Sequence, residues 1–83
     1  MKLKTWRLRA NLTQDEAAEM LGIEQAAVSL YESGKRGVSL ARALRIESRT
    51  GGMVRAEHLP LTERARDSIR LLRRLTRGSA KAG

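Results

Sequence analysis

Apolar residues recur at every third or fourth position along most of the chain, which is the spacing of one face of an α-helix. In the first such segment, residues 2–10, Leu3, Trp6 and Ala10 fall on one face, so we expect a short helix with Trp6 in the core. Similar segments follow, interrupted by glycines and cap residues. The pattern therefore predicts an all-α chain folded as a small bundle of about five helices.

Residues 14–33 predict two short helices joined by one tight turn. Thr13 and Glu16 form a capping box, which begins the first of these helices, and Gly22 ends it because glycine readily adopts the left-handed conformation. The second helix is expected over residues 25–33 and ends at the next glycine. The buried faces are formed by small and apolar residues, namely Ala17, Ala18, Leu21, Ile23, Val28 and Tyr31.

A fourth helix is predicted between Ser39, which can cap it, and about Thr50. Its register is set by Leu40, Ala43, Leu44 and Glu47. Two glycines end this helix, and residues 53–60 then form an irregular stretch in which a short strand is an alternative. Within the stretch we expect Met53, Val54 and Leu59 to close the bottom of the core.

The last helix is expected to begin at Thr62 and to end at about Arg77. One stripe of it carries Ala65, Ile69, Leu72 and Thr76, and its six arginines lie elsewhere. This basic segment, residues 61–77, has three interpretations: it packs on the same core, pairs with its copy in a second subunit, or lays its arginines along DNA. We favour pairing, and we expect residues 78–83 to be disordered.

The paired helices and their surroundings resemble the Cro/C1-type, XRE-like helix-turn-helix family of phage repressors and related bacterial regulators. The resemblance covers roughly residues 3–50. It rests on Arg7, Leu12-Thr13-Gln14, Ala18, Gly22, Gln25 and Tyr31-Glu32-Ser33-Gly34-Lys35. A shorter stretch, TGGMVRAEHL, is similar to the segment after the fourth helix of small phage Cro-like and YdaS-like proteins. The resemblance implies a lambda-repressor-like DNA-binding domain over residues 1–60, with helices 2 and 3 as the helix-turn-helix.

Composition agrees with a small nucleic-acid-binding protein. The 83 residues, 41% of them hydrophobic, can form one small core, and the formal net charge of +8 favours a polyanionic partner. The chain has no cysteine and a single histidine, His58, so we expect no metal site, no cofactor and no enzyme activity. The start lacks the apolar stretch of a signal peptide, and no run reaches the length of a membrane span. We therefore expect a cytoplasmic, nucleoid-associated protein of a bacterial or phage-infected cell, with no small-molecule ligand.

The charges are unevenly distributed along the chain. Residues 1–11 hold four basic and no acidic side chains, residues 12–34 hold five acidic and no basic ones, and residues 35–83 hold thirteen basic and four acidic ones. Such an arrangement lets flanking lysines and arginines bind phosphates while neutral side chains read bases. The alternative is that these are only solvated surface charges.

In a helix-turn-helix, the N-terminal residues of the second helix meet base edges in the major groove. Gln25 begins that helix here, and its amide can pair with adenine N6 and N7. The alternative is an exposed helix-start residue. Ala26, Ser29 and Leu30 are expected near the same surface, and Leu30 either meets a thymine methyl group or belongs to the core.

The resemblance also assigns roles outside the base-reading positions. Gln14 is implied to contact a phosphate and to steady Gln25 through an amide hydrogen bond; the alternative is an ordinary first-turn residue. By their position in and before the loop after the second helix, Lys35, Arg36 and Ser33 are placed for phosphates, and the alternative is a solvated basic turn. Arg7 and Glu32 match a pair that forms a structural salt bridge in the family. Glu24 departs from the family's frequent serine. This departure weakens the expectation of base contacts here, because a carboxylate repels phosphates unless it accepts from a cytosine N4 or only interacts with the helix dipole.

Together these observations predict a sequence-specific, double-stranded-DNA-binding transcriptional regulator, a small phage- or prophage-type repressor that acts by occupying its operator as a homodimer. The alternative is an antitoxin-like protein-interaction module. Its acidic patch, Asp15, Glu16 and Glu19, would bind a basic surface of a protein partner.

Overall fold

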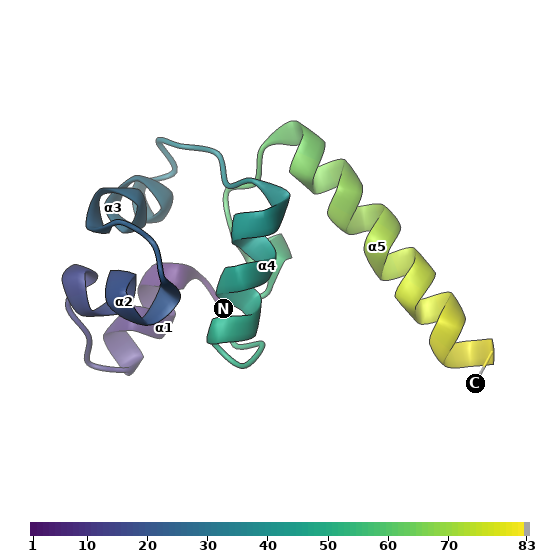
Figure 1. The fold of residues 1–83 in the computed structure, drawn as a ribbon, viewed down its shortest axis with the longest axis horizontal. Coiled ribbons are helices and arrows are strands. Elements are labelled where there is room, and N and C mark those ends of the chain that lie inside the picture. The colour runs from purple at the N-terminus through teal and green to yellow at the C-terminus, as the bar shows by residue number, and fades with distance from the viewer. Residues whose placement is uncertain (83) are drawn as a thin grey trace.

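A computed structural model describes the backbone of residues 1–82 and the side chains of residues 1–76. The predicted all-α class is confirmed: five α-helices and one 3-10 turn follow one another in this part of the chain. They are α1 (Leu3–Arg9), α2 (Gln14–Leu21), α3 (Gln25–Ser33), α4 (Leu40–Arg49), η1 (Ala56–His58) and α5 (Glu63–Ala82). In Figure 1, α1, α2 and α3 cluster on one side of α4, and α5 leads away on the other side.

The helix starts follow the caps in the sequence. Thr13 Oγ1 accepts from the Glu16 N–H at 3.1 Å, and Glu16 Oε1 accepts from the Thr13 N–H at 2.9 Å, which completes the predicted capping box. Ser39 Oγ accepts from the Arg42 N–H at 3.3 Å at the start of α4. The Thr62 hydroxyl likewise accepts from an N–H of the first turn of α5 at 3.1 Å. These polar side chains satisfy backbone N–H groups that the helices leave unpaired.

The helix ends share one backbone motif, which sets the tight turn between α2 and α3. Gly22 has φ +69°, its N–H donates to the Glu19 carbonyl at 3.3 Å, and the Ile23 N–H donates to the Ala18 carbonyl at 3.0 Å. This pair of bonds is the Schellman motif, which requires a left-handed residue after the helix. The same pair of bonds closes α1, α3 and α4, at Asn11, Gly34 and Gly51.

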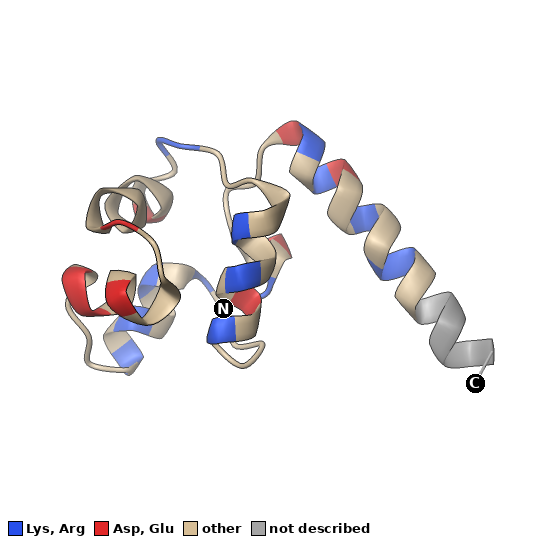
Figure 2. Ribbon diagram, viewed as in Figure 1, with Lys and Arg blue, Asp and Glu red and all other residues tan. Residues whose placement is uncertain are grey.

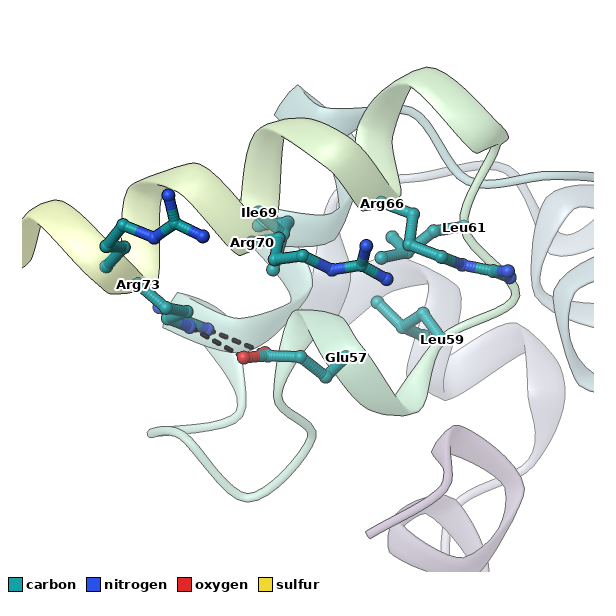
Figure 3. A pocket seen from close by; sticks show the side chains of 8 residues that line it. Glu57, Leu59, Leu61, Arg66, Ile69, Arg70 and Arg73 are labelled. Atoms are coloured by element: carbon teal, nitrogen blue, oxygen red, sulfur yellow. Dashed lines mark hydrogen bonds and ion pairs between the residues drawn. The ribbon is translucent and has the colours of Figure 1, made fainter.

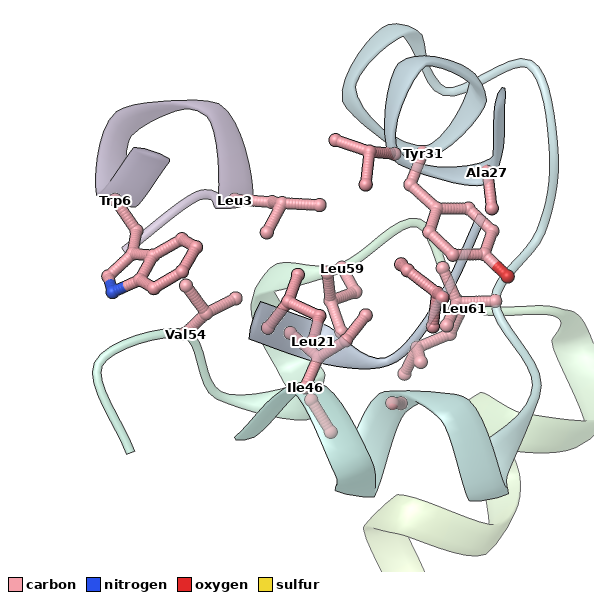
Figure 4. Close-up of a cluster of buried hydrophobic side chains, with 14 of the residues drawn as sticks. Leu3, Trp6, Leu21, Ala27, Tyr31, Ile46, Val54, Leu59 and Leu61 are labelled. Carbon is pink, nitrogen blue, oxygen red and sulfur yellow. The ribbon is translucent and has the colours of Figure 1, made fainter. Parts of the chain in front are cut away.

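The core forms where α1, α2, α3 and α4 meet the segment around η1 (Figure 4). Its fully buried large side chains are Leu21, Val28, Val38, Ile46, Val54 and Ile69. Val38 and Leu61 also form an isolated parallel bridge, in which the Val38 N–H donates to the Pro60 carbonyl at 2.8 Å. The bridge joins the segment before α4 to the segment before α5. In the described structure, residues 53–60 hold η1 and not the short strand that the sequence left open there.

One expected core position, Met53, is wrong, and three residues of the predicted apolar stripes, Ala10, Leu72 and Thr76, are exposed. Ala10 is exposed because α1 ends one residue earlier, so Ala10 only caps the helix. Met53 is exposed because it ends the loop through the two glycines, and Val54 takes the buried position instead. Leu72 and Thr76 share the stripe of Ala65 and Ile69 but are exposed, since α5 packs on the body only through its first half (Figure 1).

The last helix is longer than the sequence indicated. Its backbone continues to Ala82, past the expected end at Arg77 and through most of the segment 78–83 that we expected to be disordered. Gly83 lies outside the described residues.

One arginine attaches the middle of α5 to the rest of the fold. Arg73 forms ion pairs with Glu47 of α4 and with Glu57 of η1, the latter at 2.8 Å. Glu47 also accepts from the Ala56 N–H at 2.9 Å. The hydrogen bonds from Arg73 are the main reason that the pKa of Glu57 falls to about 2 from its ordinary 4.5. The ion pairs of Arg73 therefore link α5 to α4 and η1.

This cluster predicts a specific acid sensitivity. A carboxyl whose pKa is lowered by folding stabilises the fold above its ordinary pKa and loses that contribution as the pH falls toward the folded pKa. Urea unfolding at pH 6, 4 and 3 should show that Glu57→Gln is less stable than wild type by at most about 1 kcal/mol at pH 6, because the pair is partly exposed to solvent. The difference should fade between pH 4.5 and 2. A difference that stays constant over this range would contradict the assignment.

Candidate nucleic-acid interface

A buried ion pair fixes α3 against α1. Arg7 Nε lies 2.6 Å from Glu32 Oε2 and Arg7 Nη2 lies 3.1 Å from Glu32 Oε1, so the contact is bidentate. The two side chains are only 11% and 5% exposed. The hydrogen bonds that Arg7 donates to Glu32 raise the pKa of the Arg7 guanidinium. This is the pair that the resemblance implied.

The same ion pair also holds the start of α2. Arg7 Nη1 donates to the Leu12 carbonyl at 3.0 Å, and Gln14 Nε2 donates to Glu32 Oε1 at 3.3 Å. The resemblance implied a hydrogen bond between the side-chain amides of Gln14 and Gln25. In the structure the Gln14 amide donates to Glu32 instead. Gln14 is half-buried at the first position of α2. It therefore sits beside α3 through the ion pair.

The outward face of α3 begins at its first residue. Gln25, Ala26 and Ser29 are exposed, while Ala27, Val28 and Tyr31 of the same helix are buried in the core. Leu30 is half-buried, so part of its side chain packs against the protein and part faces solvent. The Gln25 amide is thus presented to solvent at the N-terminal end of α3, on a helix whose other face is fixed by packing.

The loop after α3 carries two basic side chains beside this face. Lys35 and Arg36 are both exposed, and Figure 2 shows them as the basic segment between α3 and α4. The Ser33 hydroxyl donates to the Leu30 carbonyl at 3.2 Å. The loop is anchored by the Schellman bond from the Lys35 N–H to the same carbonyl at 2.9 Å. The two cations are therefore held close to the end of α3.

Comparison with known proteins identifies the family to which the segment with this geometry belongs. A model of the helix-turn-helix family of the Cro/C1 type matches residues 3–52, which is 50 of the 83 residues. The chain belongs to the Cro/C1-type helix-turn-helix family. Its members are DNA-binding regulators. No curated protein and no solved structure matches the chain. The family match covers α1 to α4 and stops before η1 and α5.

The residue that departs from the family's frequent serine makes an ion pair that sequence reasoning missed. Glu24 precedes Gln25, and its carboxylate accepts from Arg42 Nη1 at 3.0 Å and from Nη2 at 3.4 Å. Arg42 Nη1 also lies 3.4 Å from the Tyr31 hydroxyl. The hydrogen bond from Arg42 is the main cause of a lowered pKa at Glu24. The carboxylate directly before α3 is therefore paired with an arginine of α4.

Two more arginines of α4 bind the helix-turn-helix turn from the same side. Arg45 Nη1 donates to the Gly22 carbonyl at 3.1 Å, and Arg49 Nη1 donates to the Met20 carbonyl at 3.3 Å. Cations are favourable at the C-terminal end of a helix, where carbonyls lack partners. With Arg42, these arginines recur at the three- and four-residue spacing of one helix face, and that spacing was the signal available in the sequence.

A second cationic surface lies away from α3, in a groove between η1 and α5 (Figure 3). Leu59, Leu61 and Ile69 form its apolar lining, and its arginines are Arg66, Arg70, Arg73 and Arg74.

The exposed surface of α2 is acidic. It carries Asp15, Glu16 and Glu19, and Figure 2 shows this acidic helix among basic elements. None of the helices described is long and apolar enough to cross a membrane.

The ion pair between α1 and α3 predicts a large and specific loss of stability. Arg7→Met should lower the free energy of unfolding by about 3 to 5 kcal/mol, because it leaves the Glu32 carboxylate buried without its partner. Arg9→Met removes an exposed arginine two positions further along the same helix and serves as the matched control. Urea titration followed by circular dichroism measures both. Equal, small losses in the two variants would show that the pair does not hold the fold.

Proposed function

We propose that the chain is a sequence-specific regulator of transcription that binds double-stranded DNA and represses by occupying its operator. The observation that carries the proposal is the exposed amide of Gln25 at the start of α3, a helix whose opposite face is packed into the core. In helix-turn-helix proteins this position meets base edges in the major groove.

Each exposed residue of the interface has a proposed part in binding. Gln25 pairs with adenine N6 and N7, and Ala26, Ser29 and the exposed part of Leu30 offer methyl and hydroxyl contacts to neighbouring bases. Lys35 and Arg36 contact phosphates, as do the Gln14 amide and the Ser33 hydroxyl, whose proton turns from the Leu30 carbonyl to the phosphate when DNA binds. The phosphate contacts set the register of α3, and the base contacts give the sequence preference.

We propose further that the operator is bound by a homodimer that forms through α5. Leu71 and Leu75, one helical turn apart, are 55% and 60% exposed, and Leu72 adjoins them. Of the arginines that line the groove, Arg66 and Arg73 lie opposite Leu71 and Leu75 around the helix, so the leucines form a short apolar strip on a helix that projects from the body. A second copy of the same strip would cover it, and a two-fold dimer matches a symmetric operator.

A protein partner is the second candidate function. The exposed acidic residues Asp15, Glu16 and Glu19 on α2 support it, because they form a surface that a basic partner could bind. The two functions can coexist in one protein. Binding to DNA without any sequence preference would favour the partner function.

The role of Gln25 is tested with DNA from upstream of the gene and a scrambled duplex of equal composition. Wild type should prefer the upstream DNA, and Gln25→Ala should lose about 5- to 150-fold of that affinity, the range for one bidentate base contact. Thr5→Ala, an exposed change on α1, is the control and should bind as wild type does. Fluorescence anisotropy at two salt concentrations measures this. Equal, salt-labile binding of both duplexes by wild type would refute sequence reading.

The dimer is tested on free protein by sedimentation velocity. The double variant Leu71→Gln/Leu75→Gln should sediment as a monomer at concentrations where wild type is a dimer, because burial of the leucine strip supplies the association energy. Leu8→Gln is the control, since Leu8 on α1 is equally exposed, at 58%, but lies outside the strip. A wild-type monomer at every concentration, or an unchanged dimer in the double variant, would exclude association through α5.

A further inference from the structure

Glu24 occupies the N-cap position of α3 without acting as a cap. Its backbone is extended, with φ −75° and ψ 149°, but its side chain makes no hydrogen bond to the first turn of the helix. The side chain is 67% exposed and lies directly before Gln25. The carboxylate is therefore available at the same end of α3 as the proposed base-reading amide.

Arg42 holds this carboxylate in one orientation. The two hydrogen bonds from the guanidinium, at 3.0 and 3.4 Å, occupy one site on each carboxylate oxygen. Arg42 is itself fixed by the Tyr31 hydroxyl at 3.4 Å and by the start of α4. A carboxylate has about four acceptor sites, so Glu24 keeps sites for a further donor.

The ion pair also offsets the repulsion between the Glu24 carboxylate and the phosphates of DNA. A lone carboxylate would be repelled by phosphates, but the charge of Glu24 is balanced by Arg42, and Arg36 lies near enough to lower the pKa of Glu24 as well. Glu24, Ala26, Arg36, Ser39 and Arg42 line one shallow groove beside the start of α3. The end of the reading helix can therefore approach a duplex with this side chain in place.

We propose that Glu24 is a specificity-determining residue that accepts a hydrogen bond from the N4 amino group of a cytosine, at the base pair next to the one read by Gln25. The inference rests on the proposed function. Cytosine is favoured because its N4 group is a donor in the major groove. Adenine also presents a donor, N6, but the acceptor N7 beside it would repel a carboxylate.

The experiment is a selection of binding sites from random double-stranded DNA by the full chain. Wild type should enrich a motif in which a cytosine adjoins the position whose preference is lost in Gln25→Ala. In Glu24→Gln that cytosine should be replaced by adenine, because an amide both donates to N7 and accepts from N6. Titration of the two motifs should show a change in preference of about tenfold in each direction.

Glu19→Gln is the matched control for the change in charge. Glu19 is an exposed acidic residue of α2, and its loss should raise the affinity for all DNA slightly and leave the motif unchanged. The same motif from wild type and Glu24→Gln, with Gln25→Ala still altered, would overturn the role of Glu24 and leave the proposed function standing. A wild-type protein that enriches no motif would overturn both.

Discussion

The buried ion pair between Arg7 and Glu32 is the interaction on which the DNA-binding unit depends. It lies at the C-terminal end of α3 and adds to the packing of Ala27, Val28 and Tyr31, which holds the buried face of this short helix. Through this pair, the guanidinium contacts the end of α3 and the Leu12 carbonyl, and the Glu32 carboxylate contacts the start of α2 through Gln14. One charge pair thus sets the relative positions of three helices. As a consequence α3, which begins at Gln25, is held against α1 and α2 near its C-terminal end.

The basic residues of the chain divide into separate tasks, although they look alike in the sequence. Arg7, Arg45 and Arg49 bind carboxylates or carbonyls within the fold, and Arg73 joins α5 to the acidic residues of α4 and η1. The exposed Lys35 and Arg36 lie beside the end of α3, where we propose that they contact phosphates. These ion pairs remove basic and acidic charges together, so the excess positive charge of the chain is carried by basic side chains outside them. This division explains how an acidic helix pair can belong to a DNA-binding protein.

The sequence predicted best what depends on local chemistry. The capping box at Thr13 and the left-handed Gly22 define α2 from their own neighbours, so its bounds were correct. Errors arose where distant packing decides: Met53 and Val54 are adjacent and both apolar, and only the path of the loop selects Val54 for the core. The ion pair of Glu24 with Arg42 was also missed, because it joins residues 18 positions apart on different helices. The proposed base contacts of Gln25, Ala26, Ser29 and Leu30 stay predictions.

The central claim is that the N-terminal end of α3 reads the sequence of double-stranded DNA. The most direct measurement is an NMR titration of the isotope-labelled protein with a duplex chosen by selection and with a scrambled duplex. The account predicts that the selected duplex shifts the amide signals of residues 24–30 and 33–37 and the Gln25 side-chain signals, and that the scrambled duplex leaves the Gln25 side chain unchanged. Shifts confined to the arginine-lined groove of α5, or identical shifts with both duplexes, would contradict it.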